Sequence, residues 1–277
     1  MESALELLYR GDWPAHLWSA LPTSRRVSVT RRSISRSTNG GPPCRVAFAS
    51  DLHVGPTTPV SLLREAFAAI QRERPDVLLL GGDYIFLEAV PSRLAILQSL
   101  VESVSCLVKL AVLGNHDLWT TDHAIVDALT DVGVKVLVNE VFPLPAPWSD
   151  VVVVGLDDPL TGRCDASAAA AQLDGEPFRI FLCHSPDGLA FLSGLQFNVF
   201  LAGHTHGGQI AAPWGPIVLP NGPMCSEYPS GFAQFGQGLV YVSRGVGTVE
   251  LPIRSFAPPD ILLLELLSSD GAGSAGR

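Results

Sequence analysis

The sequence lacks any apolar run long enough to cross a membrane as a helix, which takes about 20 residues. Its densest apolar stretch, residues 261–267, has the length of a strand and contains Glu265. Charged residues make up only 16% of the chain against 47% hydrophobic residues, so extensive disorder is excluded. The first six residues, MESALE, lack the basic and apolar regions of a secretory signal. We therefore expect a globular protein in the cytoplasm.

The cysteines do not show a spacing that is typical of disulfide pairs or metal sites. There are five cysteines, an odd number, and none of them form a C-x-x-C motif. Disulfide scaffolds and structural zinc sites of the usual kind are therefore disfavoured. We expect reduced thiols that pack as small apolar side chains.

Positive charge is scarce outside the N-terminal segment. Residues 1–45 carry seven basic and three acidic residues, whereas residues 46–277 carry 11 basic and 24 acidic residues, a net charge of −13. General nucleic-acid binding is disfavoured, because phosphate contacts need clustered positive charge. An acidic protein that handles phosphate needs another positive group, and a bound metal is the obvious candidate.

The composition changes at about residue 44. Residues 1–43 predict an N-terminal extension rich in Ser and Arg. It is either an arm or strand that covers the edge of the main domain, or a basic tether in weak contact with an anionic membrane surface. Residues 44–268 predict one catalytic domain and residues 269–277 a flexible tail. The sequence indicates no oligomeric state.

Short apolar strands alternate with periodic helices in the first half of the chain, and strands dominate the second half. The expected helices cover residues 59–73, 91–105, 122–132 and 166–173. The expected strands cover residues 45–50, 77–80, 108–113, 134–138, 151–156, 178–183, 199–202, 238–243 and 260–267. This order predicts an α/β fold.

Polar side chains follow five of these strands at their carboxyl ends, where α/β sheets collect functional groups. They are Asp51 with His53, Asp83, Asn115 with His116, His184, and His204 with His206. The donors are nitrogen and oxygen without thiolate, which suits manganese, iron, zinc or similar ions. They are too many for one ion, so we expect two.

The motifs that carry these residues resemble those of the calcineurin-like metallophosphoesterase superfamily. Asp51-Leu-His53, Gly82-Asp83, Gly114-Asn-His-Asp117, Cys183-His184 and Gly203-His-Thr-His206 occur in the order of that superfamily. Residues 155–163, 203–210 and 241–254 are similar to its bacterial branch of YkuE-like and YaeI-like phosphodiesterases.

The resemblance implies a four-layer αββα sandwich of two mixed β-sheets flanked by helices. It also implies a division of ligands: Asp51, His53 and His206 on one metal ion, Asn115, His184 and His204 on the other, and Asp83 bridging both. The ions would be manganese, iron or zinc, with magnesium, cobalt or nickel as alternatives. His116 would stay uncoordinated and face the leaving group.

We therefore expect an enzyme that hydrolyses small-molecule phosphoesters, with phosphodiesters favoured. A metal-bridging hydroxide would attack phosphorus, His116 would act as general acid, and Asp83 and Asn115 would complete the catalytic set. Asp157, Asp158, Arg163 and Arg244 are candidate substrate contacts, although a turn or an ion pair is the commoner role for such residues. Two alternatives stay open: a pyrophosphohydrolase for a nucleotide-sugar or lipid-linked diphosphate, and a non-catalytic protein-binding scaffold of the same fold.

Overall fold

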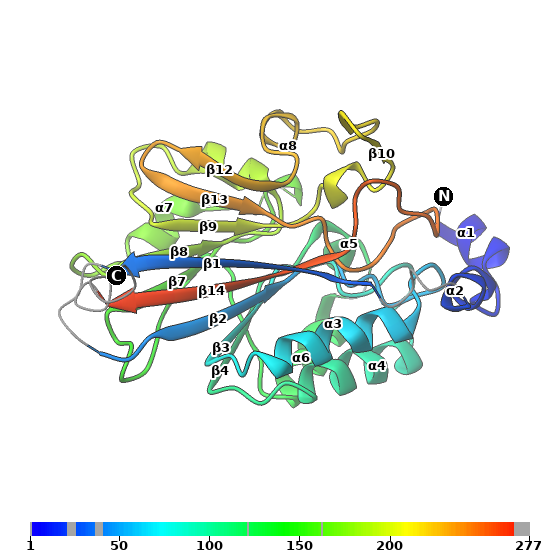
Figure 1. The fold of residues 1–277 in the computed structure, drawn as a ribbon, viewed down its shortest axis with the longest axis horizontal. Helices are drawn as coiled ribbons and strands as arrows, with labels where there is room; N and C mark the ends of the chain where they lie inside the picture. The colour runs from blue at the N-terminus through cyan, green and yellow to red at the C-terminus, as the bar shows by residue number, and fades with distance from the viewer. Residues whose placement is uncertain (1, 21–25, 37–40, 121, 162, 269–277) are drawn as a thin grey trace, which may run out of the picture.

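Two six-stranded mixed sheets pack face to face, and helices cover their outer faces (Figure 1). The computed structural model describes residues 2–20, 26–36, 41–120, 122–161 and 163–268. One apolar core lies between the two sheets. A second lies between the first sheet and its helices, and a third lies between the second sheet and its helices. The expected four-layer αββα sandwich is confirmed.

The first sheet has the strand order β1-β14-β2-β3-β4-β5. Its strands are β1 (Ser28–Arg36), β14 (Asp260–Ser268), β2 (Cys44–Ala49), β3 (Val77–Leu80), β4 (Val108–Ala111) and β5 (Lys135–Val136). Strands β2 to β5 are parallel, so helices connect them: α3 (Val60–Arg72), α4 (Pro91–Glu102) and α6 (Asp122–Asp131). Helix α3 illustrates why these helices pack on the sheet, because its apolar residues Leu63, Phe67 and Ile70 lie on one buried face.

The second sheet has the order β12-β13-β9-β8-β7-β6. Its strands are β6 (Glu140–Pro143), β7 (Val151–Gly155), β8 (Phe178–Leu182), β9 (Val199–Ala202), β12 (Gly231–Phe235) and β13 (Gly238–Val242). Short helices cover its outer face: α7 (Ala166–Ala170), the 3₁₀ helix η3 (Pro186–Phe191) and α8 (Pro223–Glu227). Strands β7, β8, β9 and β13 are parallel, and the arrows in Figure 1 show β2 and β9 pointing toward the same end of the molecule.

Strand β1 agrees with the first interpretation of the N-terminal extension, an arm or strand that covers the edge of the main domain, for residues 28–36. It pairs in parallel with β14 from Ser28 opposite Asp260 to Arg36 opposite Ser268, so this segment is an edge strand. The division at residue 44 stays a prediction. Residues 21–25, 37–40 and the expected tail at 269–277 lie outside the described residues. Among those described, no helix combines the length and apolar character needed to cross a membrane.

Several elements differ from the expected ranges. The strand expected at 108–113 ends at Ala111, and the chain turns into the short helix α5 (Asn115–Trp119), while the strand expected at 134–138 has only two paired residues. Strands β6 and β12 were not expected, because both are partly exposed edge strands with a weak apolar pattern. The remaining short elements are the 3₁₀ helices η2 (Pro159–Thr161) and η4 (His206–Gly208) and the hairpin of β10 (Ala211–Ala212) and β11 (Gly215–Pro216).

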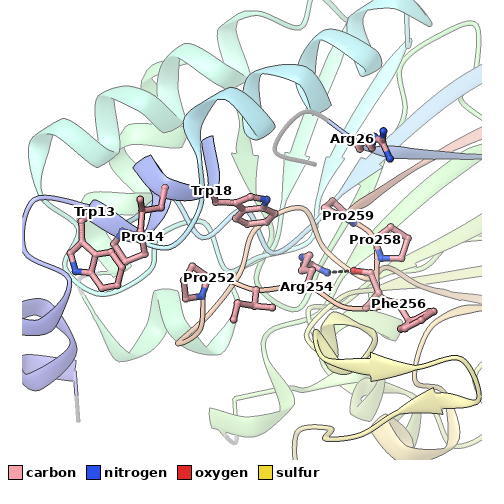
Figure 2. Close-up of a pocket in the computed structure, with 12 residues that line it drawn as sticks. Trp13, Pro14, Trp18, Arg26, Pro252, Arg254, Phe256, Pro258 and Pro259 are labelled. Carbon is pink, nitrogen blue, oxygen red and sulfur yellow. Dashed lines mark hydrogen bonds between the residues drawn. The ribbon is translucent and has the colours of Figure 1, made fainter. Parts of the chain in front are cut away.

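Helices α1 (Glu2–Leu8) and α2 (Trp13–Ser19) lie at the end of the molecule toward which β2 and β9 point (Figure 1). The N–H of Ala15 in α2 donates to the Pro56 carbonyl at 2.9 Å, just beyond the end of β2. Between α2 and residues 252–259 lies a groove of about 500 Å³, shown in Figure 2. We call it the apolar groove.

Candidate metal centre

The polar residues that follow the strands meet where the strand ends of the two sheets come together. Backbone hydrogen bonds connect the loops there. The N–H of Asp51 donates to the backbone carbonyl of Gly82, and the N–H of His53 donates to the backbone carbonyl of Asp83. The N–H of His204, from the second sheet, reaches across to the Asp51 carboxylate at 3.0 Å. The strand ends of both sheets therefore form one site.

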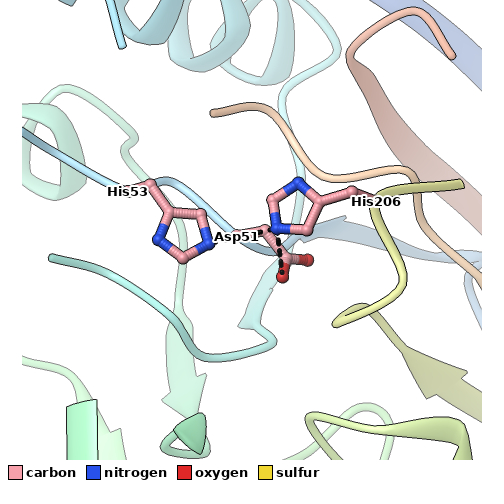
Figure 3. A group of neighbouring side chains, drawn as sticks. All are labelled: Asp51, His53 and His206. Carbon is pink, nitrogen blue, oxygen red and sulfur yellow. Dashed lines mark hydrogen bonds and ion pairs between the residues drawn. The ribbon is translucent and has the colours of Figure 1, made fainter. Parts of the chain in front are cut away.

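The first ligand group consists of Asp51, His53 and His206 (Figure 3). All three side chains are buried, and their ligand atoms lie within 4.8 Å of one another. Nε2 of His53 lies 3.1 Å from Nε2 of His206, which lies 3.5 Å from Oδ1 of Asp51. This is a set of two nitrogens and one oxygen around a common point.

The second ligand group consists of Asp83, His184 and His204, also buried. Nε2 of His184 lies 3.2 Å from Nδ1 of His204 and 3.2 Å from Oδ2 of Asp83. The same Asp83 oxygen lies 3.5 Å from Nε2 of His53 in the first ligand group. Asp83 thus faces both groups, as a bridging carboxylate must.

Asn115 adds an oxygen that nothing else uses. Its Oδ1 is buried and accepts no hydrogen bond from any residue the structure describes. Buried polar atoms are usually paired, so an unpaired carbonyl-type oxygen at the start of α5, one residue before the His116 N–H that donates to Asp83, fits a metal ligand. His184 has the opposite arrangement: its Nδ1 lies 2.8 Å from the Gly81 carbonyl, which leaves Nε2 free to face the site.

Backbone conformation at the site is strained in the way that functional sites often are. Five ligand candidates have left-handed φ values between +43° and +69°: Asp51, His53, Asp83, His204 and His206. Such conformations cost roughly 1–3 kcal/mol each and persist only where the surroundings enforce them. Glycine is required beside them: a Cβ at Gly203 would collide with Oδ2 of Asp51, and a Cβ at Gly114 with Oδ1 of Asp83.

Burial dominates the electrostatics of the carboxyl groups. It raises the pKa of Asp51 to about 7 and the pKa of Asp158 to about 6. Burial opposes ionisation of Asp83 as well, but the charges of His184 and His116 hold its pKa well below the usual value. Several carboxyl groups therefore compete for little positive charge, and a cation would satisfy them.

The imidazoles are mostly in the form that binds metals. Burial lowers the pKa of His204 to about 3 and holds the pKa of His53 and His206 well below the usual value. Only His184 differs: burial opposes its protonation, yet contact with Asp83 raises its pKa. Three of the four imidazoles are thus neutral ligands at neutral pH, and a cation would displace the proton of the fourth.

These residues fit a pair of metal ions. Nitrogens 3.1 Å apart, as in His53 and His206, subtend roughly 95° at an ion about 2.1 Å from each, between octahedral and tetrahedral angles. Each group offers imidazole and carboxylate donors without sulfur. That donor set suits manganese, iron or zinc, and the arrangement allows two ions with a shared carboxylate.

His116 and Asp117 lie in α5, directly after Asn115. The half-buried His116 ring packs edge-on against His53 and Trp119, with centroids 5.1 and 5.3 Å apart. Asp117 is fully buried and accepts the backbone N–H groups of Asp83, Tyr84 and Gly114 at 2.7–2.9 Å. The Asp117 carboxylate therefore holds the turns after β3 and β4 together, a role that the sequence alone did not assign.

Arg254 is the residue near the site that sequence reasoning missed. Its guanidinium donates to the backbone carbonyls of Gly247, Ala257 and Arg244, and its Nη2 lies 3.1 Å from Nδ1 of His206. Burial lowers the pKa of Arg254 to about 10, so the group remains charged at neutral pH. The available signal was its position in the motif at 241–254, because an isolated Arg after Pro252 has no periodicity to reveal its contacts.

The four candidate substrate contacts are held by other parts of the protein. Oδ2 of Asp158 accepts the N–H groups of η2, whereas its Oδ1 is buried without a partner among the described residues. Asp157 accepts the N–H of Asp158. Arg163 lies 3.9 Å from Asp122, and Arg244 lies 3.2 Å from Asp260. Turn formation and ion pairing thus account for their visible contacts, and substrate binding by them stays a prediction.

Known proteins are similar to this chain over most of its length. A family model described as calcineurin-like phosphoesterase matches residues 44–208, which contain both ligand groups, Asn115 and His116. Phosphodiesterase YaeI of Escherichia coli (strain K12) is 31% identical over 230 residues, covering 81% of this chain and 83% of that protein.

Two further relatives span a similar share of the chain. The metallophosphoesterase YkuE of Bacillus subtilis (strain 168), described as uncharacterized, is 30% identical over 250 residues and covers 88% of this chain and 87% of that protein. UDP-2,3-diacylglucosamine pyrophosphatase LpxG of Chlamydia muridarum is 28% identical over 275 residues, covering 80% of this chain and 83% of that protein.

Proposed function

Because this chain belongs to the calcineurin-like phosphoesterase family, we propose that it hydrolyses small-molecule phosphodiesters at a pair of metal ions. The observation that carries the proposal is the position of Asp83 between the two ligand groups, with one oxygen 3.5 Å from His53 and 3.2 Å from His184. A carboxylate so placed would serve two cations at once.

We assign the first ion to Asp51, His53 and His206, and the second to His184, His204 and the Asn115 oxygen, with Asp83 shared. Bound cations there would supply Lewis acidity and positive charge for a phosphate group in an otherwise acidic protein. Manganese, iron and zinc are the proposed ions, because the donors are imidazole and carboxylate.

The chain's own residues then supply the proton that the leaving group needs. His116 packs on His53, at the edge of the first ligand group, and its imidazole donates a proton to the departing alkoxide. Its backbone is fixed by the hydrogen bond to Asp83, so the proton donor is held in register with the shared carboxylate. Asp117 fixes the turn that carries both.

Phosphodiesters are favoured over other esters because the relative YaeI, named a phosphodiesterase, is 31% identical over most of both chains. The alternative is hydrolysis of a nucleotide-sugar or lipid-linked diphosphate, supported by 28% identity to the pyrophosphatase LpxG. A protein-binding scaffold is disfavoured, since a scaffold needs neither two complete ligand groups nor strained backbone at five of their residues.

The deciding experiment is a reconstitution series on demetallated protein with manganese, iron, zinc, magnesium, cobalt or nickel. Each sample is assayed against bis-nitrophenyl phosphate, nitrophenyl phosphate and a nucleotide-sugar diphosphate. The proposal predicts metal-dependent turnover, fastest on the diester. Preference for the diphosphate would favour the alternative, and no turnover with any ion would refute phosphoester hydrolysis. The cytoplasmic location stays a prediction that cell fractionation tests.

A further inference from the structure

The apolar groove beside α2 is a feature that phosphoester hydrolysis leaves unexplained. Its lining combines two segments far apart in sequence, α2 with Arg26 and residues 252–259 (Figure 2). Large apolar side chains on its walls face solvent: Trp13 is 46% exposed, Leu17 64%, Ile253 55% and Phe256 68%. Soluble proteins rarely gather so many exposed apolar side chains without a binding partner.

The chemistry of the lining selects the kind of ligand. No lining side chain carries an oxygen atom, so none can accept a hydrogen bond. Four of the twelve lining residues are prolines, which have no backbone N–H: Pro14, Pro252, Pro258 and Pro259. The Trp13 indole already donates to the Leu8 carbonyl, and the Arg254 guanidinium donates to three backbone carbonyls. The lining side chains thus offer a peptide backbone few hydrogen-bond partners, whereas a hydrocarbon chain needs none.

The charge at the groove is positive, whereas the net charge of the protein is negative. The chain has a net charge of −9, yet among the residues that the structure describes, the charged ones that line the groove are both basic, Arg26 and Arg254. Arg26 is exposed. Asp12, which precedes α2, lies 3.8 Å from Arg93. An apolar channel with an exposed arginine matches a molecule that has an acyl chain and an anionic head group.

The groove adjoins the metal centre through one shared residue, Arg254. Arg254 lines the groove and touches His206 of the first ligand group at 3.1 Å. Segment 252–259 is hydrogen-bonded to the chain after η4 through Ser255 and Gln209 at 3.0 Å. The next hairpin, which lies beside Phe256 in Figure 2, carries Trp214 at its turn with 88% of its surface exposed. Tryptophan is a residue that favours the membrane interface.

We propose that the apolar groove binds an acyl chain of an anionic phospholipid in a bilayer, so that the protein docks on the membrane with its metal-centre end. Leu17, Ile253 and Phe256 contact the acyl region, and Arg26 contacts the phosphate of the head group. This docking goes beyond the proposed function, because it requires neither bound metal nor turnover.

Vesicle flotation with the full chain tests the docking. The vesicles contain phosphatidylcholine alone or phosphatidylcholine with 30% phosphatidylglycerol, in 100 mM salt. We expect binding to the anionic vesicles, a partition coefficient lowered about tenfold or more in Leu17→Ser/Phe256→Ser, and a smaller loss in Arg26→Gln. Leu107→Ser is the matched control, because Leu107 is 63% exposed but precedes β4 at the other end of the sheet, and it should bind as the wild type does.

Two further measurements make the outcome unambiguous. Phospholipid brominated in its acyl chains should quench tryptophan fluorescence in the wild type, and less in Trp13→Phe. Turnover of bis-nitrophenyl phosphate by the metal-loaded Leu17→Ser/Phe256→Ser variant should equal that of the wild type, so loss of docking and loss of the proposed function are distinguished. Docking is refuted if the protein does not bind anionic vesicles or if Leu107→Ser weakens binding equally. It is also refuted if sedimentation shows that the double variant loses self-association while its binding to vesicles is unchanged.

Discussion

The backbone N–H of His116 donates a hydrogen bond of 2.9 Å to Oδ1 of Asp83. The other oxygen of the same carboxylate faces His53 and His184, one imidazole from each ligand group. The proposed proton donor and the proposed shared ligand are therefore linked directly, and a change at either should affect a defined step.

Replacing His116 with alanine should slow only the reactions that need a proton donor. We expect kcat to fall by roughly 10²–10⁴-fold for an alkyl phosphodiester, whose leaving group is poor. Turnover of bis-nitrophenyl phosphate should change much less, because nitrophenolate departs without protonation. His123→Ala is the control, since that side chain is 92% exposed on α6. Equal losses on both substrates would remove the general-acid role of His116.

Removing the Asp117 carboxylate should destabilise the turns after β3 and β4. In Asp117→Ala, three buried N–H groups lose their acceptor, and each unsatisfied group costs about 1–3 kcal/mol. We expect a loss of about 3 kcal/mol or more in unfolding free energy by urea denaturation. Asp174→Ala, at an exposed position, should be neutral. A neutral Asp117→Ala would show that these bonds do not hold the turns.

Arg254 should set the metal affinity of the first ligand group. It fixes the chain around Gly247 and Ala257 and contacts His206, so Arg254→Met should weaken binding of one ion by about 10–100-fold, the usual effect of losing a residue that orients a ligand. Calorimetric titration of demetallated protein measures this. Arg179→Met is the matched control, because Arg179 also donates to backbone carbonyls, those of Gly175 and Gln196. Unchanged affinity would contradict the role of Arg254.

The ion pair between Glu6 and Arg93 predicts that the contribution of α1 to the stability of the protein depends on pH. Burial alone would raise the pKa of Glu6, but the hydrogen bond from Arg93 at 2.8 Å and one from the Glu88 amide lower it below its usual 4.5. The stabilisation is therefore present above pH 4.5 and disappears as pH falls through the lowered pKa. Glu6→Gln should be less stable than wild type at pH 7, by less than about 1 kcal/mol, and equally stable in acid. Denaturation curves at both pH values measure this. A difference in stability between Glu6→Gln and the wild type that persisted in acid would contradict it.

The central strands and the site could be predicted from sequence because their signals are local. Strands such as β3 (Val77–Leu80) are buried on both faces and read as unbroken apolar runs that end at a polar residue. The ligand candidates follow those runs directly, and the packing of the two sheets brings them together.

Features that depend on contacts across the chain could not be predicted. Strand β1 reads as a polar Ser- and Arg-rich arm, and only its pairing with β14, 232 positions later from Ser28 to Asp260, defines it as a strand. The apolar groove likewise joins α2 to residues 252–259, two segments whose sequences say nothing about each other. The left-handed backbone at Asp51 and His204 is imposed by the closed site and contradicts local preference.

The number of ions bound per chain tests the account most directly. Demetallated protein is reconstituted with manganese, iron or zinc, and bound metal is counted by elemental analysis for the wild type and for Asp83→Ala. We predict two ions per wild-type chain and weakened binding of both in Asp83→Ala, because Asp83 faces both ligand groups. A wild-type chain that binds no ion, or an Asp83→Ala variant that still binds two with wild-type affinity, would contradict the shared metal centre.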